Sequence, residues 1–171
     1  MYSVDSLETV VELRDVPQSD VGAPLPLVVA DEMRVLLAYL ISQPDPNWDG
    51  TYVNVVSSDT EGAVAIITFD SPAVHMFGPP NDEAFSGHPL ADRGLTPYSV
   101  AEIQNSSWLR QMVRMNAVHP QHRDDAFADC RHFIFAFHDS TFECIADGFS
   151  VDLFRGSINQ ALKYIVAQTL A

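Results

Sequence analysis

Apolar and polar positions alternate along much of the chain, which predicts a protein rich in β-strands. The clearest alternation runs from Arg131 to Asp147, RHFIFAFHDSTFECIAD, and its interruption at His138-Asp139-Ser140 predicts a β-hairpin. Other apolar runs bounded by turn residues predict further strands. These runs are Thr9–Leu13, Pro26–Ala30, Met33–Ile41, Thr51–Ser57, Ala63–Phe69, Ala73–Phe77 and Tyr98–Gln104. Short connections favour antiparallel pairing, although Met33–Ser42 also fits a helix by propensity.

Three segments show helical signals instead. Asn105 or Ser106 can cap a helix that runs through Met115. Residues Ser157–Gln160 (SINQ) resemble a capping box that opens a last helix, and Arg123–Cys130 fits a short helix. The residues expected to point inward are Trp108, Leu109, Met112 and Met115 in the first helix and Ile158, Leu162, Ile165 and Val166 in the last.

These elements predict the fold class. A chain of 171 residues is long enough for one domain with a substantial core, and it contains no internal repeat or linker. We therefore expect a single α+β domain over residues 1–171. Its largely antiparallel, curved sheet is expected to pack against two or three helices, including a C-terminal helix.

The hairpin is predicted to have two unlike faces. A two-residue turn at Asp139-Ser140 puts an apolar set in the core, namely Phe133, Phe135, Phe137, Phe142, Cys144 and Ala146. The opposite face carries four candidate catalytic residues: His138, Glu143, His132 and Asp147. In this register Glu143 lies diagonally across from His138, and Asp147 lies directly across from His132. A nearby carboxylate raises the pKa of an imidazole and orients the ring for acid or base catalysis.

Two other interpretations of this hairpin bear on its chemistry. Three successive residues cannot converge as nucleophile, base and acid, so His138-Asp139-Ser140 is not expected to form a Ser-His-Asp triad. The alternative to catalysis is structural: Asp139, Ser140 and Thr141 make turn hydrogen bonds, and His138 and Glu143 lie on a solvated face.

The long segment Gly78–Pro97 is a second candidate site. Its glycines and prolines predict a loop, and long loops in compact domains are often functional. It carries four acid, amide and imidazole groups suited to acid-base or metal chemistry: Asn81, Asp82, Glu83 and His88. The alternative is that the loop is structural or faces solvent.

Metal and cofactor signals are weak. His119 and His122 are spaced for a shared metal only if Pro120 does not break the turn, and surface histidines are the alternative interpretation. There is no HExxH, paired CxxC or EF-hand pattern, and no nucleotide-cofactor motif of the Walker or dinucleotide type.

Charge is concentrated in the first half of the chain. The formal net charge is −14, of which −12 falls in Met1–Pro89 and −2 in Leu90–Ala171. Such a negative field repels phosphate backbones, so nucleic acid is not an expected partner. A basic protein is a possible partner, and the alternative is that the acidity simply favours solubility.

Neither a membrane nor an export signal is expected. The longest clean apolar run, Val35–Ile41, is far shorter than the roughly 20 residues of a membrane-spanning helix. The acidic start MYSVDSLETVVELRD does not resemble a signal peptide, so we expect a cytoplasmic protein. Cys130 and Cys144 are then expected to be reduced, buried thiols.

Two functions follow from these patterns. In the first, the protein is an acidic binding module of the inhibitor or immunity type, which presents its first half to a basic protein. In the second, it is a small hydrolase-type enzyme, acid-base or weakly metal-dependent. The enzyme would use the hairpin face with His138 as acid or base, Glu143 orienting it, and groups of the Gly78–Pro97 loop.

Overall fold

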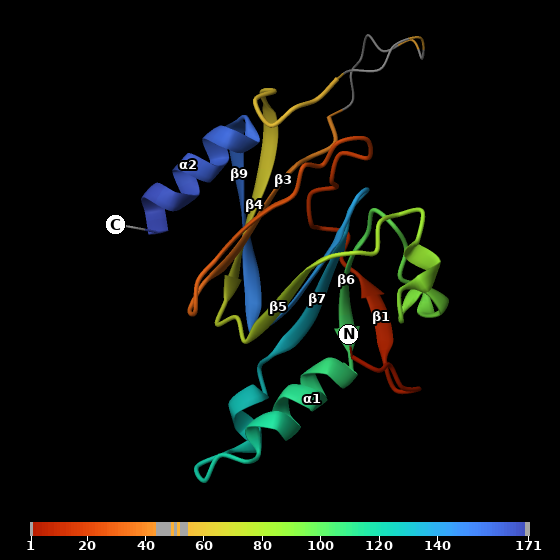
Figure 1. Cartoon of the computed structure of the whole chain (residues 1–171), viewed down its shortest axis with the longest axis vertical. Coiled ribbons are helices and arrows are strands. Elements are labelled where there is room, and N and C mark those ends of the chain that lie inside the picture. The colour runs from red at the N-terminus through yellow and green to blue at the C-terminus, as the bar shows by residue number, and fades with distance from the viewer. Residues whose placement is uncertain (1, 44–48, 50, 52–54, 170–171) are drawn as a thin grey trace.

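The computed structural model describes residues 2–43, 49, 51 and 55–169 and shows two antiparallel sheets that pack face to face (Figure 1). The first sheet has the strand order β1-β6-β7-β8-β5, and the second has the order β2-β3-β4-β9. The strands are β1 (Thr9–Glu12), β2 (Leu27–Ala30), β3 (Val35–Leu40), β4 (Gly62–Asp70), β5 (Val74–Gly78), β6 (Val100–Gln104), β7 (Arg131–Ala136), β8 (Thr141–Ala146) and β9 (Gly148–Gly156). The antiparallel pairing that the short connections predict is confirmed.

Helices cover the outer faces of the two sheets. Helix α1 (Ser107–Asn116) packs on the first sheet and α2 (Ile158–Thr169) on the second, so the order of layers is α2, sheet, sheet, α1 (Figure 1). The capping box that opens the C-terminal helix is confirmed: Ser157 N–H donates to Gln160 Oε1 at 3.0 Å, and Gln160 N–H donates to Ser157 Oγ at 3.2 Å. Short 3-10 helices span Phe85–Gly87, Ala91–Arg93 and Asp124–Phe127.

Aromatic side chains fill the space between the sheets. All six apolar hairpin residues expected in the core belong to this cluster, together with residues of β3 and β4. The Phe69 ring lies at its centre, with ring centroids 6.0 Å from Phe135, 5.4 Å from Phe142 and 5.8 Å from Phe149. Such tilted and edge-on ring pairs stabilise a core beyond the burial of their surface.

The single curved sheet predicted from the sequence is wrong, because the chain crosses three times between two sheets. It first passes from β1 to β2 through the long segment 13–26. The other two crossings are short: Ser71–Ala73 carry the chain from β4 to β5 in the first sheet, and Asp147 returns it from β8 to β9 in the second. Short connections of this kind are indistinguishable from hairpin turns in sequence. The strand β9 was not predicted. The predicted strand Thr51–Ser57 lies partly outside the described residues, and its described residues 51 and 55–57 are not in a strand.

The hairpin register also differs from the prediction. Ala136 pairs with Thr141 and Ile134 with Glu143, so the connection has four residues, with Phe137 N–H donating to Ser140 O at 2.8 Å. The prediction with a two-residue turn was therefore off by two positions. Because the side-chain period of a strand is two, this shift leaves every side chain on its predicted face.

The aromatic core generates the first prediction. Phe69→Ala removes a ring buried between both sheets and should lower the free energy of unfolding by about 3–5 kcal/mol, measured by urea denaturation. Phe77→Ala is the control, because Phe77 is 46% exposed and its loss should cost about 1 kcal/mol or less. Equal losses in the two variants would contradict this account of the core.

Candidate functional site

The middle of the hairpin's polar face, at His132 and Glu143, is buried and not open to solvent as one interpretation of the sequence expected. His132 is 0% exposed and Glu143 is 4% exposed. Three segments cover them: the N-terminal segment through Tyr2, the loop after β5 through His88, and α1 through Trp108. The hairpin face and the Gly78–Pro97 loop therefore do meet, and at His88 and Glu143 they meet in a closed interior.

The Glu143 carboxylate is the acceptor at the centre of this interior. Tyr2 Oη donates to Glu143 Oε2 at 2.6 Å, and His132 Nε2 lies 2.9 Å from the same oxygen. His88 Nε2 lies 3.4 Å from Glu143 Oε1. These partners come from the chain's start, from β7 and from the loop, so one carboxylate joins three distant parts of the sequence.

The other ring nitrogens assign the tautomers of the two histidines. Leu90 N–H donates to His88 Nδ1 at 3.1 Å, so the proton of the neutral ring lies on Nε2 and points to Glu143. Leu109 N–H donates to Ser106 Oγ at 3.1 Å, and Ser106 Oγ lies 2.9 Å from His132 Nδ1. The Ser106 hydroxyl can then donate to His132, and His132 in turn to Glu143.

These hydrogen bonds keep Glu143 ionised. Burial alone raises the pKa of a carboxyl group, but the hydrogen bonds from His132 and His88 outweigh it and lower the pKa of Glu143 to about 2. Burial and the adjacent carboxylate raise the pKa of Tyr2, which remains a neutral donor. Among the described residues, no buried side-chain nitrogen or oxygen lacks a hydrogen-bond partner.

A cavity of about 380 Å³ reaches the end of this chain of hydrogen bonds. Ser106 and His132 both line it, beside Leu109, Arg110 and Cys130. The volume falls in the usual range of small-molecule sites, roughly 300–1,000 Å³. Burial raises the pKa of the Cys130 thiol to about 11, so this neighbour is no thiolate nucleophile at neutral pH.

A second, partly exposed cluster forms where the loop meets the hairpin tip. His138 Nδ1 lies 3.0 Å from Asp82 Oδ2 and 2.9 Å from Tyr98 Oη, and Tyr98 also donates to Asp82. The hydrogen bonds from Tyr98 and from His138 lower the pKa of Asp82, and Asp82 raises the pKa of Tyr98 to about 12. Tyr98 has a φ of 60°, an unusual backbone conformation for a bulky residue.

The four candidate catalytic residues of the hairpin have other partners than the sequence predicted. The predicted pairs His138 with Glu143 and His132 with Asp147 are wrong, because the register differs by two residues. His132 pairs with Glu143 instead, and His138 contacts Asp82. Asp147 is exposed and accepts a hydrogen bond from Cys130 Sγ at 3.4 Å.

The other predicted site residues lie outside the two clusters. Asn81 Oδ1 accepts from Ala84 N–H at 3.1 Å in a turn, and Glu83 is exposed. His119 and His122 lie after α1, where His119 Nδ1 accepts from the main chain and His122 Nδ1 contacts Asn116. In the described part of the chain, no group of three or more His, Cys, Asp and Glu side chains is arranged to hold a metal ion.

Three site residues were missed by sequence reasoning. Ser106 was recognised as a helix cap, but nothing in its spacing connects it to His132. Tyr2 and Tyr98 carry no local signal, since their partners lie 141 and 40 positions away. Only the tertiary fold brings these hydroxyls to the histidines and carboxylates.

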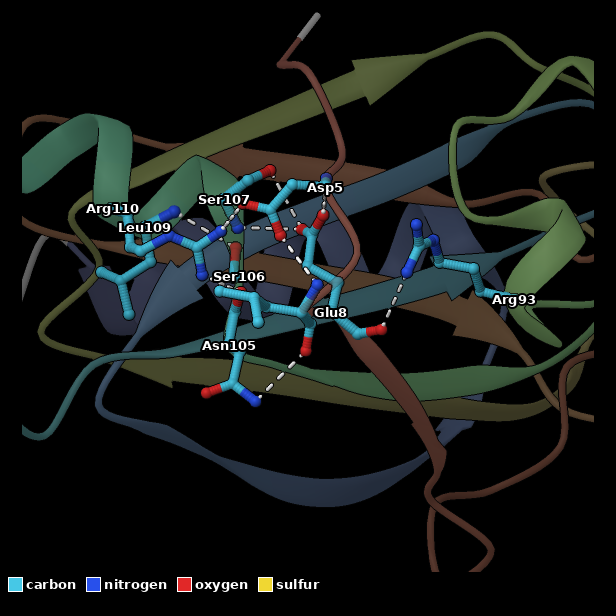
Figure 2. A network of polar contacts seen from close by, with 9 residues as sticks. Asp5, Glu8, Arg93, Asn105, Ser106, Ser107, Leu109 and Arg110 are labelled. Carbon is cyan, nitrogen blue, oxygen red and sulfur yellow. Dashed lines mark hydrogen bonds and ion pairs between the residues drawn. The ribbon is translucent and has the colours of Figure 1, made fainter.

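The first residues of the chain are tied to the start of α1 (Figure 2). Glu8 Oε1 accepts from Ser107 N–H at 2.9 Å and from Ser107 Oγ at 3.0 Å, and Glu8 Oε2 accepts from Asp5 N–H at 3.0 Å. Arg110 forms an ion pair with Asp5, and Asn105 Nδ2 donates to Leu7 O at 3.3 Å. Glu8 is only 4% exposed, so this carboxylate is held inside the joint between the N-terminal segment and the helix.

Comparisons with protein-family models, curated proteins and solved structures returned no match for this chain. None of the helices in the described residues is long and apolar enough to span a membrane.

The ionised, buried Glu143 generates a prediction on pH and stability. Its pKa falls from 4.5 to about 2 on folding, so it stabilises the fold fully above pH 4.5, and this contribution is lost as the pH falls toward 2. At 1.36 kcal/mol per pKa unit, the contribution is about 3 kcal/mol. Glu143→Gln should lose about this much at pH 7 and flatten the pH dependence below 4.5, measured by urea denaturation at several pH values. Glu83→Gln, in the exposed loop, is the control and should have the pH dependence of the wild type. If the free energy of unfolding of Glu143→Gln varied with pH in parallel with that of the wild type, Glu143 would not be the ionised, buried group described here.

Proposed function

We propose that the protein is a small hydrolase in which Ser106 is the nucleophile, His132 the base and Glu143 the group that orients His132. The observation that carries this proposal is the unbroken series of hydrogen bonds from Ser106 Oγ to His132 Nδ1 and from His132 Nε2 to Glu143 Oε2. The three residues come from the β6–α1 junction, β7 and β8, so they converge from different elements, as a nucleophilic triad requires. This moves the base of the expected enzyme from His138 to His132.

The reaction is an acyl transfer to water. Ser106 Oγ attacks the acyl carbon while its proton passes to His132 Nδ1, and Glu143 stabilises the imidazolium that forms. His132 then gives this proton to the leaving group as the bond to it breaks. Water, deprotonated by His132, attacks the acyl-serine, and Ser106 recovers its proton.

The site's surroundings indicate the substrate class. The cavity of about 380 Å³ that Ser106 and His132 line accommodates a small molecule. The net charge of −14 disfavours anionic substrates. The charged side chains of the lining are already engaged, since Arg110 pairs with Asp5 and Arg131 with Glu102. These features favour a small neutral ester or amide.

The test is covalent labelling by an alkyl fluorophosphonate, which phosphonylates an activated serine and releases fluoride. We expect the native protein to carry the adduct on Ser106, located by peptide mass spectrometry, and Ser106→Ala to carry none. His132→Gln should react at least about a hundredfold more slowly, the usual contribution of a general base.

Ser157→Ala is the matched control, because Ser157 also caps a helix but forms no described contact with a histidine. Its adduct on Ser106 should be unchanged. Because Ser106 caps α1, Ser106→Asn, which retains a capping acceptor, separates loss of the nucleophile from loss of the helix. A native protein that is labelled elsewhere but not on Ser106 would contradict the proposal.

A specific observation also favours the binding-module function, as a second candidate. One end of the second sheet gathers the acids Asp31, Glu32, Asp70 and Asp147, with Arg34 as the adjacent base, paired with Asp31. Within the described residues, Glu32, Asp70 and Asp147 form no ion pair, so their charge is available to a basic protein surface.

This second candidate predicts salt-dependent binding of a lysine-rich peptide at that end of the sheet. The variant Glu32→Lys/Asp70→Lys should bind such a peptide at least about tenfold more weakly at low salt, measured by calorimetry, because like charges repel. Glu12→Lys/Asp59→Lys, with the same change of charge elsewhere, is the control. Equal weakening by both pairs would mean that only net charge matters and would exclude a defined surface.

A further inference from the structure

The Ser106 site holds an N–H donor that is already occupied. In serine hydrolases whose nucleophile begins a helix, the main-chain N–H of the next residue stabilises the oxyanion of the intermediate. Here that residue is Ser107, and its N–H donates to Glu8 Oε1 at 2.9 Å. The Ser107 hydroxyl donates to the same oxygen at 3.0 Å, so two donors converge on one negatively charged oxygen.

The Glu8 carboxylate resembles the oxyanion that such a site binds. Its oxygen is negatively charged, accepts from an N–H and an O–H, and lies at the positive end of the α1 dipole. It is nearly excluded from water, and Figure 2 shows it pointing at the first turn of α1 from the N-terminal segment. A buried charge of this kind persists only where its hydrogen bonds offset the loss of water.

Further contacts hold the segment that carries Glu8 against the start of α1. Tyr2 donates to Glu143 and stacks on Trp108 of α1, with ring centroids 5.4 Å apart and planes 8° apart. Asp5 pairs with Arg110, which lines the Ser106 cavity. The series of hydrogen bonds from Ser106 through His132 to Glu143 is called the relay below. The N-terminal segment contacts its acid, Glu143, through Tyr2, and it contacts Ser107, next to the nucleophile, through Glu8.

We propose that the Ser107 N–H and hydroxyl are the oxyanion donors of the Ser106 site, and that Glu8 occupies them as an internal inhibitor. This inference rests on the proposed hydrolase function. Catalysis then requires Glu8 to withdraw, because an oxyanion and a carboxylate cannot share the same two donors. Only the Glu8 side chain has to leave the two Ser107 donors, and Tyr2 of the same segment keeps its hydrogen bond to Glu143.

The test compares rates of fluorophosphonate labelling of Ser106 in native full-length variants. Glu8→Ala frees both donors, so the second-order rate constant should rise at least about tenfold, given that one oxyanion donor contributes roughly a hundredfold or more. Glu8→Gln keeps an oxygen acceptor but removes the charge, and it should give a smaller increase. Glu12→Ala removes an exposed acid of β1 and should leave the rate unchanged.

The possible outcomes distinguish failure of the inhibitory role of Glu8 from failure of the proposed hydrolase function. Labelling of Ser106 at the wild-type rate, or more slowly, in folded Glu8→Ala overturns the inhibitory role and leaves the nucleophile standing. Absence of a Ser106 adduct in every variant, including Glu8→Gln, overturns both. If circular dichroism shows that Glu8→Ala is unfolded, the rate of Glu8→Gln decides, and an unchanged rate there overturns the inference.

Discussion

The structure depends on one buried negative charge, the carboxylate of Glu143. A carboxylate removed from water is stable only when hydrogen-bond donors replace its hydration, and here Tyr2, His132 and His88 supply them. Each donor belongs to a different segment of the chain. The requirement to satisfy one charge therefore positions the N-terminal segment, the long loop and β7 on the same face of the first sheet.

The same requirement links the fold to the proposed chemistry. Because Glu143 Oε2 accepts the hydrogen bond from His132 Nε2, the His132 ring presents its other nitrogen to Ser106 at the edge of a cavity. The network that holds the layers together and the relay that would activate a nucleophile are one set of hydrogen bonds. Glu8 accepts from both Ser107 donors at the start of α1, and in the proposed mechanism it withholds them from the acyl-transfer intermediate.

Local patterns predicted most elements of the fold and only part of the site. The period-two pattern placed Phe133 to Ala146 on the correct faces, and the SINQ capping box located the last helix. Register and sheet membership were wrong, because a four-residue hairpin connection and a crossing between sheets have the same polar composition as a tight turn. Glu143, His132 and His88 were recognised as candidates, but their pairing and the roles of Ser106 and Tyr2 depend on contacts between residues far apart in sequence.

The central claim is that Glu143 fixes the tautomer of His132 and so prepares Ser106 for attack. Long-range ¹H–¹⁵N NMR spectroscopy of ¹⁵N-labelled protein at pH 7 tests it most directly, because it reports which ring nitrogen carries the proton. We expect a proton on Nε2 of His132, slowly exchanging and lost from this position in Glu143→Gln. A proton on Nδ1 of His132, donated to Ser106 Oγ, would contradict it.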